Sequence, residues 1–110
     1  MRLDGEIFEK IKSGQKTIEI RLLDEKRKVL KKDDIINFGK RPTLFERLKV
    51  KVIDLKKYKS FEEVYDDFSL KDLGYTQDLN KEKFLEKMYK HYNKEEVKEY
   101  GVLAIKVVVI

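Results

Sequence analysis

The carboxyl-terminal segment, residues 102–110, constrains the fold more than any other part of the chain. Only Lys106 interrupts its apolar run, and most of its other residues are β-branched. Continuous runs of this kind are typical of strands that are buried on both faces. A membrane-spanning helix needs about 20 apolar residues, so this segment is too short to be one. We therefore expect residues 102–110 to form a central strand of a sheet.

Three earlier segments also predict strands. The segment KTIEIRLL, residues 16–23, alternates apolar and polar side chains, which is typical of a half-buried strand. A short apolar run at Ile35–Phe38 predicts another strand, and residues 39–43 predict a loop. A third strand begins near Arg47, and its apolar positions shift by one residue after Val52. That shift predicts a β-bulge or a sharp bend.

Four residues have the side chains and the positions of helix N-caps: Asp4, Ser60, Asn80 and Asn93. Gly14 is placed to end the first of these helices. The predicted order is helix, three strands, helices and strand, which does not match a doubly wound fold. We predict one α+β domain over residues 1–110, a small mixed, curled β-barrel-like sheet with flanking helices.

Composition excludes several classes of function. The chain has no cysteine, which excludes disulfides and thiolate chemistry, and its one histidine argues against a histidine-ligated metal site. It lacks a P-loop, a dinucleotide-binding fingerprint and an EF-hand, so we expect no metal and no cofactor. We see no signal peptide and no membrane span, and we expect a cytoplasmic protein. The formal net charge of +5 permits a polyanionic partner without requiring one.

The segment from Gly14 to Arg21 contains the most informative pattern, G-x-K-x-x-E-x-R. Glycine allows the chain to turn sharply into the strand and leaves backbone room for a ligand. Ideal strand geometry puts Thr17, Glu19 and Arg21 on one face. Lys16 lies at the mouth of the strand, and ideal alternation points it away, so its convergence with the others is an assumption. By spacing alone, structural salt bridging would explain the same charges.

These residues resemble the ASCH domain, a relative of the PUA domain. The resemblance extends to FEKIKSGQKTIEIRLL, LKKDDIINF, VKVIDLKKYKSFEEV and EEVKEYGVLAIKVVVI, which together make up most of the chain. One departure is Asp33, where relatives commonly have glycine. The resemblance implies a PUA-like β-barrel with flanking helices, a cleft beside the G-x-K-x-x-E-x-R strand and a function linked to RNA.

The first functional hypothesis is a module that binds RNA or a nucleotide-like small molecule in that cleft. The alternative is an amidohydrolase acting on a modified nucleoside such as N4-acetylcytidine, because one branch of the family removes that acetyl group with a Lys, a Thr and a Glu. Lys16 matches that lysine, whereas Glu19 stands where that branch has its threonine. As an enzyme, the chain would use Lys16 and Glu19 as catalytic residues. A third hypothesis is pairing with a second subunit. The candidate ligand-binding residues are Lys16, Thr17, Glu19, Arg21, Lys40 and Arg41.

A cationic stripe at helical spacing is a second candidate for phosphate binding. It comprises Lys83, Lys87, Lys90 and Lys94, with His91 beside it. We favour a solvated helix face for this stripe, because a run of charges is usually surface. Among the tyrosines, Tyr75 follows a glycine in a predicted loop and is the best candidate for an exposed aromatic platform.

Overall fold

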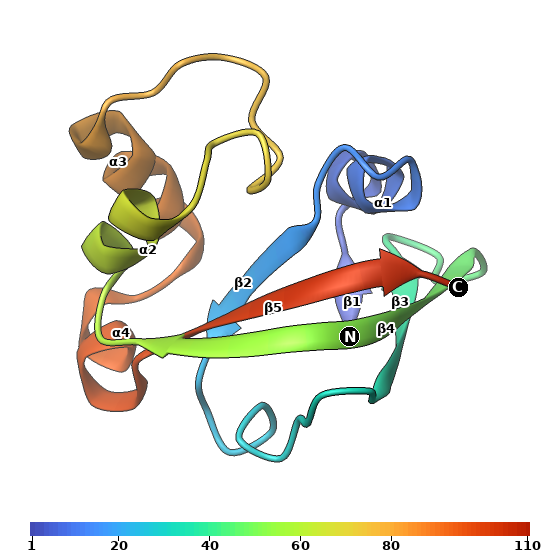
Figure 1. The fold of residues 1–110 in the computed structure, drawn as a ribbon. Coiled ribbons are helices and arrows are strands. Elements are labelled where there is room, and N and C mark those ends of the chain that lie inside the picture. Colours follow the sequence, from blue (N-terminus) through green and yellow to red (C-terminus); the bar gives the residue numbers. More distant parts are fainter.

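The computed structural model describes all residues, 1–110, as five strands and four helices (Figure 1). In chain order the elements are β1 (Arg2–Leu3), α1 (Gly5–Lys12), β2 (Ile18–Leu22), β3 (Ile35–Lys40), β4 (Arg47–Tyr58), α2 (Phe61–Asp67), α3 (Lys81–His91), α4 (Lys94–Tyr100) and β5 (Val102–Val109). This order matches the prediction except for β1, which has only two residues. None of the four helices has the length and the apolar composition that a membrane span requires.

The strands form one curled sheet with the order β1-β3-β4-β5-β2. Only the β1–β3 pair is parallel, and the other three pairs are antiparallel. Strands β1 and β2 are the two edges, and no ladder joins them, so the sheet is a half-barrel. The mixed α+β class and the barrel-like curl are as predicted. Strand β3 extends to Lys40, beyond the expected end at Phe38, because its last residues pair with β1.

Strand β5 supplies both hydrophobic clusters of the core. Leu103, Ile105 and Val107 pack in one cluster with Phe8 and Ile11 of α1. The alternate residues, Val102 and Ala104, pack in a second cluster with side chains from α2, α3 and α4. The strand lies between β4 and β2, so the predicted central position and burial on both faces are confirmed for residues 102–105.

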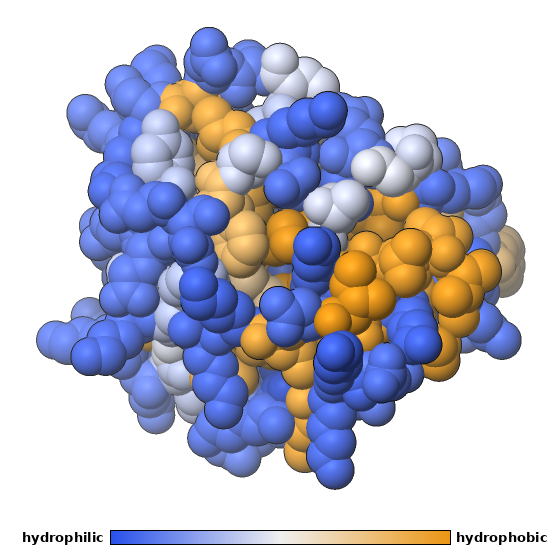
Figure 2. Space-filling model, in the orientation of Figure 1, coloured by the Kyte–Doolittle hydropathy of each residue, from blue (hydrophilic) through white to orange (hydrophobic).

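The carboxyl end of β5 departs from the prediction, because Val108, Val109 and Ile110 are exposed. Strand β2 begins at Ile18, opposite Lys106, and therefore leaves the last residues of β5 without a neighbour on that side. Figure 2 shows apolar residues gathered near this end of the molecule, while hydrophilic residues predominate on the helical side.

Local signals in the sequence explain most of the other element boundaries. The register of β4 with β5 shifts between Val52 and Asp54, at the predicted bulge. The side chains of Ser60, Asn80 and Asn93 each accept a backbone hydrogen bond at the start of a helix. Asp4 occupies the N-cap position of α1 but makes no capping hydrogen bond. Its carboxylate contacts a different partner, which belongs to the candidate site.

Candidate functional site

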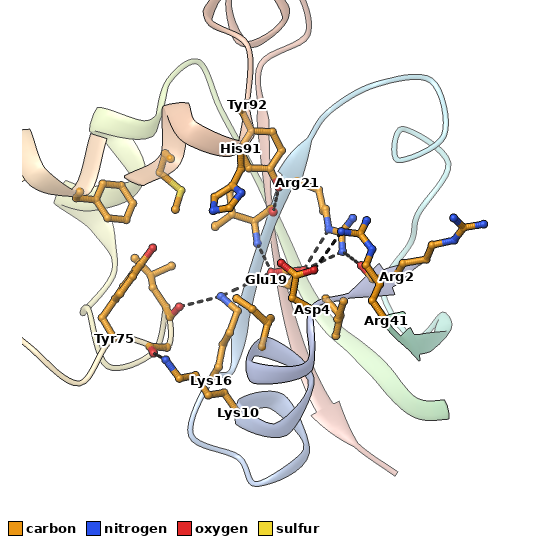
Figure 3. A pocket seen from close by; sticks show the side chains of 17 residues that line it. Arg2, Asp4, Lys10, Lys16, Glu19, Arg21, Arg41, Tyr75, His91 and Tyr92 are labelled. Carbon is orange, nitrogen blue, oxygen red and sulfur yellow. Dashed lines mark hydrogen bonds and ion pairs between the residues drawn. The ribbon is translucent and has the colours of Figure 1, made fainter. Parts of the chain in front are cut away.

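A pocket of about 340 Å³ opens where the sheet fails to close (Figure 3). Its walls come from the edge strands β1 and β2, from α1, from residues 73–75 and from α3. The polar and charged side chains that line it are Arg2, Asp4, Lys10, Lys16, Glu19, Arg21, Arg41, Tyr75, His91 and Tyr92. Leu3, Ile7, Ile20, Leu73, Phe84 and Met88 supply its apolar lining.

Lys16 reaches the floor of this pocket. Gly14 ends α1 with φ 83°, and the backbone N–H of Lys16 then donates to the carbonyl of Lys10. The ammonium donates a 2.8 Å hydrogen bond to the carbonyl of Leu73 and lies 3.6 Å from Oε1 of Glu19. The residue is only 6% exposed. Burial lowers the pKa of the Lys16 amine, and the nearby carboxylate of Glu19 opposes that shift.

Glu19 lies between two cations and is 7% exposed. Its Oε1 accepts from the backbone N–H of Ile20 at 3.2 Å, and its Oε2 accepts from Nε of Arg21 at 3.1 Å. The Nη2 of Arg21 is also 3.1 Å from Oε2. The carboxylate is therefore held in place from both sides, and Oε1 keeps one acceptor position that no hydrogen bond occupies.

Arg21 connects the two edges of the sheet. Its Nη2 donates a 2.8 Å hydrogen bond to the backbone carbonyl of Arg2 on β1. The pairs formed by Lys16, Glu19 and Arg21 show that the three side chains meet in one concave site, as the sequence hypothesis required. Both cations, however, are already engaged by protein oxygens.

Two of the candidate residues lie outside this pocket. Thr17 lies beside a separate hollow next to Val107 and Val108. Regular strand geometry starts only at Ile18, so the alternation expected for residues 16 and 17 does not apply: Lys16 turns toward Glu19, and Thr17 turns away. Lys40 pairs with Glu9 at 2.8 Å and with Glu46 at 3.6 Å, also outside the pocket.

Arg41 does line the pocket, and its Nη1 lies 3.2 Å from Oδ1 of Asp4. Both side chains of this pair are more than half exposed, at 54% for Arg41 and 62% for Asp4. This contact takes the carboxylate of Asp4 away from the helix start that the sequence predicted it to cap. Arg41 is thus the most accessible of the predicted cations that reach the pocket.

Several pocket residues were not predicted from the sequence as site residues. Lys10 lies one turn of α1 beyond Glu6, pairs with it at 3.4 Å and donates to the carbonyl of Gly74 at 2.8 Å. His91 projects from the end of α3 into the cavity (Figure 3). The only available signal was the periodicity of α3, in which Phe84, Met88 and His91 share one side of the helix.

The two sides of the pocket differ in chemistry. Counting Arg2, Lys10, Lys16, Arg21 and Arg41 against Asp4 and Glu19, its formal charge is 5 − 2 = +3 with His91 neutral. Arg2, Arg21 and Arg41 gather on one side of the pocket, whereas Tyr75 lies on the other side, beside Lys10 and Lys16 (Figure 3). Tyr75, the predicted exposed platform, is half-buried.

The two tyrosines of the pocket are polar at one end only. The hydroxyl of Tyr92 donates to the carbonyl of Ile20 at 2.9 Å. Burial, and then the charge of Glu19, raise the pKa values of Tyr75 and Tyr92, so both side chains keep their protons at neutral pH. The two tyrosine side chains therefore offer flat, uncharged surfaces, and the hydroxyl of Tyr75 is the one that donates to no protein acceptor. No group of three His, Cys, Asp or Glu side chains is placed to hold a metal ion anywhere in the chain.

Comparisons with known proteins agree with this architecture. The model of the ASCH domain family matches residues 1–110. The crystal structure of hypothetical protein PH0355 is 33% identical, has a TM-score of 0.80 and is covered over 100% of both chains. The solution NMR structure of Protein PF0455 from Pyrococcus furiosus is 30% identical, has a TM-score of 0.73 and is covered over 100% of this chain and 98% of that one.

No curated protein matches the chain. ASCH domains in general are RNA-binding modules with a PUA-like fold. The match over the full chain, the half-barrel and the Lys16–Glu19–Arg21 arrangement lead to one conclusion: this chain belongs to the ASCH domain family.

Proposed function

We propose that this protein binds RNA or a nucleotide-like ligand in the charged cleft beside β2. The observation that carries the proposal is one pocket of about 340 Å³ with three arginines on one side and Tyr75 on the other. A nucleotide has the complementary division, with an anionic phosphate at one end and a flat base at the other. The concave shape suits a single unstacked nucleotide rather than the side of a duplex.

Each side chain has a role in this proposal. Arg41, which is half exposed, contacts the phosphate and exchanges its contact with Asp4 for one with the ligand. Tyr75 stacks on the base. Glu19 accepts hydrogen bonds from the base edge or from ribose, and Lys16 and Arg21 hold Glu19 in place while contributing positive potential to the cleft. Thr17 and Lys40 have no part, because they lie outside the pocket.

The test compares two neighbouring cations of one loop. Arg41→Gln is expected to weaken binding of single-stranded RNA and to reduce the slope of log K against log salt by about 0.7, the value for one phosphate contact. Lys40→Gln removes the same charge one residue away, outside the pocket, and is the matched control. Tyr75→Ala is expected to cost about 1 to 3 kcal/mol of binding free energy through lost stacking.

Fluorescence anisotropy with labelled single-stranded RNA over a range of salt concentrations measures these effects. Equal losses in Arg41→Gln and Lys40→Gln would mean that phosphates contact the loop without entering the pocket. Unchanged binding in both Arg41→Gln and Tyr75→Ala would reject the pocket as the binding site.

One observation favours a second function, an amidohydrolase acting on a modified nucleoside. Burial lowers the pKa of Lys16, and a lysine needs such a shift to act as a general base near neutral pH. In this reaction the neutral amine takes a proton from water, the resulting hydroxide adds to the acyl carbon, and the proton then passes to the departing nitrogen as the C–N bond breaks. Glu19, with Oε1 3.6 Å from the amine, orients it.

Incubation with N4-acetylcytidine followed by chromatography tests this alternative. The expected products are cytidine and acetate, and Lys16→Met, checked for folding by circular dichroism, is expected to form neither. Absence of product from the folded wild-type protein would reject this substrate. Turnover at the wild-type rate by Lys16→Met would reject the role of the lysine.

A further inference from the structure

Helix α3 carries three lysines along the flank that adjoins the pocket. Successive residues of an α-helix are rotated by about 100° around its axis. A lysine that directly precedes a pocket-lining residue therefore lies about 100° around the helix from it, always in the same direction. Lys83 precedes Phe84, Lys87 precedes Met88 and Lys90 precedes His91, and all three of the following residues line the pocket. Lys83, Lys87 and Lys90, here called the α3 flank, therefore form a row parallel to the edge of the pocket.

The acidic residues of α3 lie farther from the pocket. The same rotation places Glu82 and Glu86 beyond the three lysines, on the side of the helix opposite Met88 and His91. The remaining side of the helix, with Leu85 and Tyr89, packs into the core. The part of the exposed surface of α3 that is nearest the pocket is thus the cationic part.

The three lysines of the α3 flank are not used in ion pairs. The only ion pair of α3 is between Lys81 and Asp66, at 2.7 Å, and no carboxylate lies within 4.0 Å of Lys83, Lys87 or Lys90. Lys83 and Lys87 have a like-charge i,i+4 spacing, which weakens a helix, whereas Glu86 and Lys90 have the favourable i,i+4 spacing but form no ion pair. These cations therefore contribute little to the fold, and their charges remain available to a ligand.

We propose that the α3 flank binds the backbone phosphates of a single-stranded RNA whose terminal or unstacked nucleotide occupies the pocket. This inference rests on the proposed function of the pocket and adds its partner: a strand several nucleotides long rather than a free nucleotide. The row from Lys83 to Lys90 is about 10 Å long, at 1.5 Å of rise per residue. It thereby provides a track for the strand as it leaves the pocket beside His91.

The favoured interpretation from the sequence alone was a solvated face. Two structural facts change that interpretation: the α3 flank borders the pocket, and it is free of acidic partners. Neither follows from the spacing of the lysines, because the spacing does not say which side of the helix faces β2.

The experiment compares two triple variants of equal charge. Lys83→Gln/Lys87→Gln/Lys90→Gln removes the α3 flank, and glutamine keeps a helix propensity close to that of lysine. The control, Lys26→Gln/Lys32→Gln/Lys59→Gln, removes three exposed lysines that neither line the pocket nor form ion pairs. The probes are a labelled single-stranded RNA of mixed sequence, about eight nucleotides long, and the four nucleoside monophosphates.

We expect the α3-flank variant to reduce the salt slope for the RNA by about 2, which is three phosphate contacts at about 0.7 each. Its affinity for the monophosphates and the behaviour of the control variant are expected to match the wild type. Equal effects of the two triple variants, or wild-type RNA binding by the α3-flank variant, would overturn the inference.

The experiment also separates this inference from the proposed function. If the RNA effect is present but no monophosphate binds and Arg41→Gln has no effect, the α3 flank stands and the pocket proposal falls. If monophosphates bind in the pocket and the α3-flank variant binds RNA like the wild type, the pocket proposal stands and this inference falls.

Discussion

Arg21 joins the two open edges of the sheet through a 2.8 Å hydrogen bond from its Nη2 to the backbone carbonyl of Arg2. The same guanidinium contacts Oε2 of Glu19 at 3.1 Å, so one side chain both bridges the half-barrel and fixes the carboxylate of the pocket. A planar guanidinium makes several directed contacts at once, whereas the ammonium of lysine does not match that geometry. The gap between β1 and β2 is therefore held by a side chain and not by a ladder.

Arg21→Gln is expected to lower the free energy of unfolding by about 2 to 3 kcal/mol, because it leaves a buried carboxylate with one cationic partner fewer. Arg21→Lys keeps the charge and is expected to recover only part of the loss. Urea denaturation followed by circular dichroism measures both, with Arg47→Gln as the control at an exposed arginine of β4. Full recovery by Arg21→Lys would show that charge, and not the bridge, is what matters.

Lys16 is expected to lose its proton at a lower pH than the other lysines, because burial disfavours the charged form and lowers the pKa of its amine. Its unfolded value is about 10.4, so between the lowered folded value and about 10.4 the unfolded chain binds more protons. In that window the contribution of Lys16 to the free energy of unfolding rises with pH. Carbon-13 NMR of the lysine Cε resonances measures the titration directly.

Lys40 is the internal reference for this titration, because its hydrogen bond to Glu9 raises the pKa of its amine. The pKa of Lys16 should therefore lie below the pKa values of the exposed lysines, and the pKa of Lys40 should lie above them. In the Lys16→Arg variant, the Cε resonance that titrates at the lowest pH should be missing, which assigns that resonance to Lys16. Titration of Lys16 together with or after Lys40 would contradict the burial of its ammonium.

Gly74→Ala is expected to disturb the floor of the pocket. Gly74 has φ 96°, and a Cβ there would lie 2.9 Å from Cδ of Lys16, so both the backbone and the lysine must move. The loss in free energy of unfolding is expected to be about 1 to 3 kcal/mol. Gly14→Ala is the matched control, because Gly14 has φ 83° but no atom lies within 4 Å of its added Cβ. If the loss in free energy of unfolding is no larger in Gly74→Ala than in Gly14→Ala, the side chain of Lys16 can move aside without cost.

Asp33 adopts φ 77°, a backbone conformation that glycine adopts without steric cost. Glycine would therefore suit this position, and aspartate, which tolerates the left-handed region, is accepted here. Asp33→Ala is expected to be less stable than Asp33→Gly by about 1 kcal/mol. Thermal denaturation of the two variants measures the difference, and equal melting temperatures would contradict the argument.

The elements that could be predicted from the sequence are those whose cause is local. The apolar β-branched run of β5, the register shift after Val52 and the caps at Ser60, Asn80 and Asn93 each depend on a few adjacent residues. Strand β1 could not be predicted, because two residues show no periodicity and its pairing with β3 is a tertiary contact. Phe45, which is 87% exposed, likewise has no local signal that separates it from a core residue.

The candidate site was predicted along residues 14–21 and at Arg41 and Tyr75, but not elsewhere. The G-x-K-x-x-E-x-R pattern correctly brought together Lys16, Glu19 and Arg21, but ideal alternation misplaced Thr17, since strand geometry begins one residue later. His91 had no acidic or nucleophilic neighbour in the sequence, yet it shares the pocket with Glu19. Which flank of α3 faces β2 depends on packing between distant segments, and helical periodicity does not encode it.

The pocket is assembled from segments that lie far apart in the chain. Its internal contacts join residues separated by 57 positions for Lys16 and Leu73, 64 for Lys10 and Gly74, and 72 for Tyr92 and Ile20. A partly folded chain therefore has no complete site, and occupancy and folding are thermodynamically linked. A compound that fills the pocket at 100 times its dissociation constant would add about 2.7 kcal/mol to the free energy of unfolding of the entire molecule. The rise in melting temperature across a panel of nucleosides, nucleotides and short RNAs would therefore show which of them binds in the pocket.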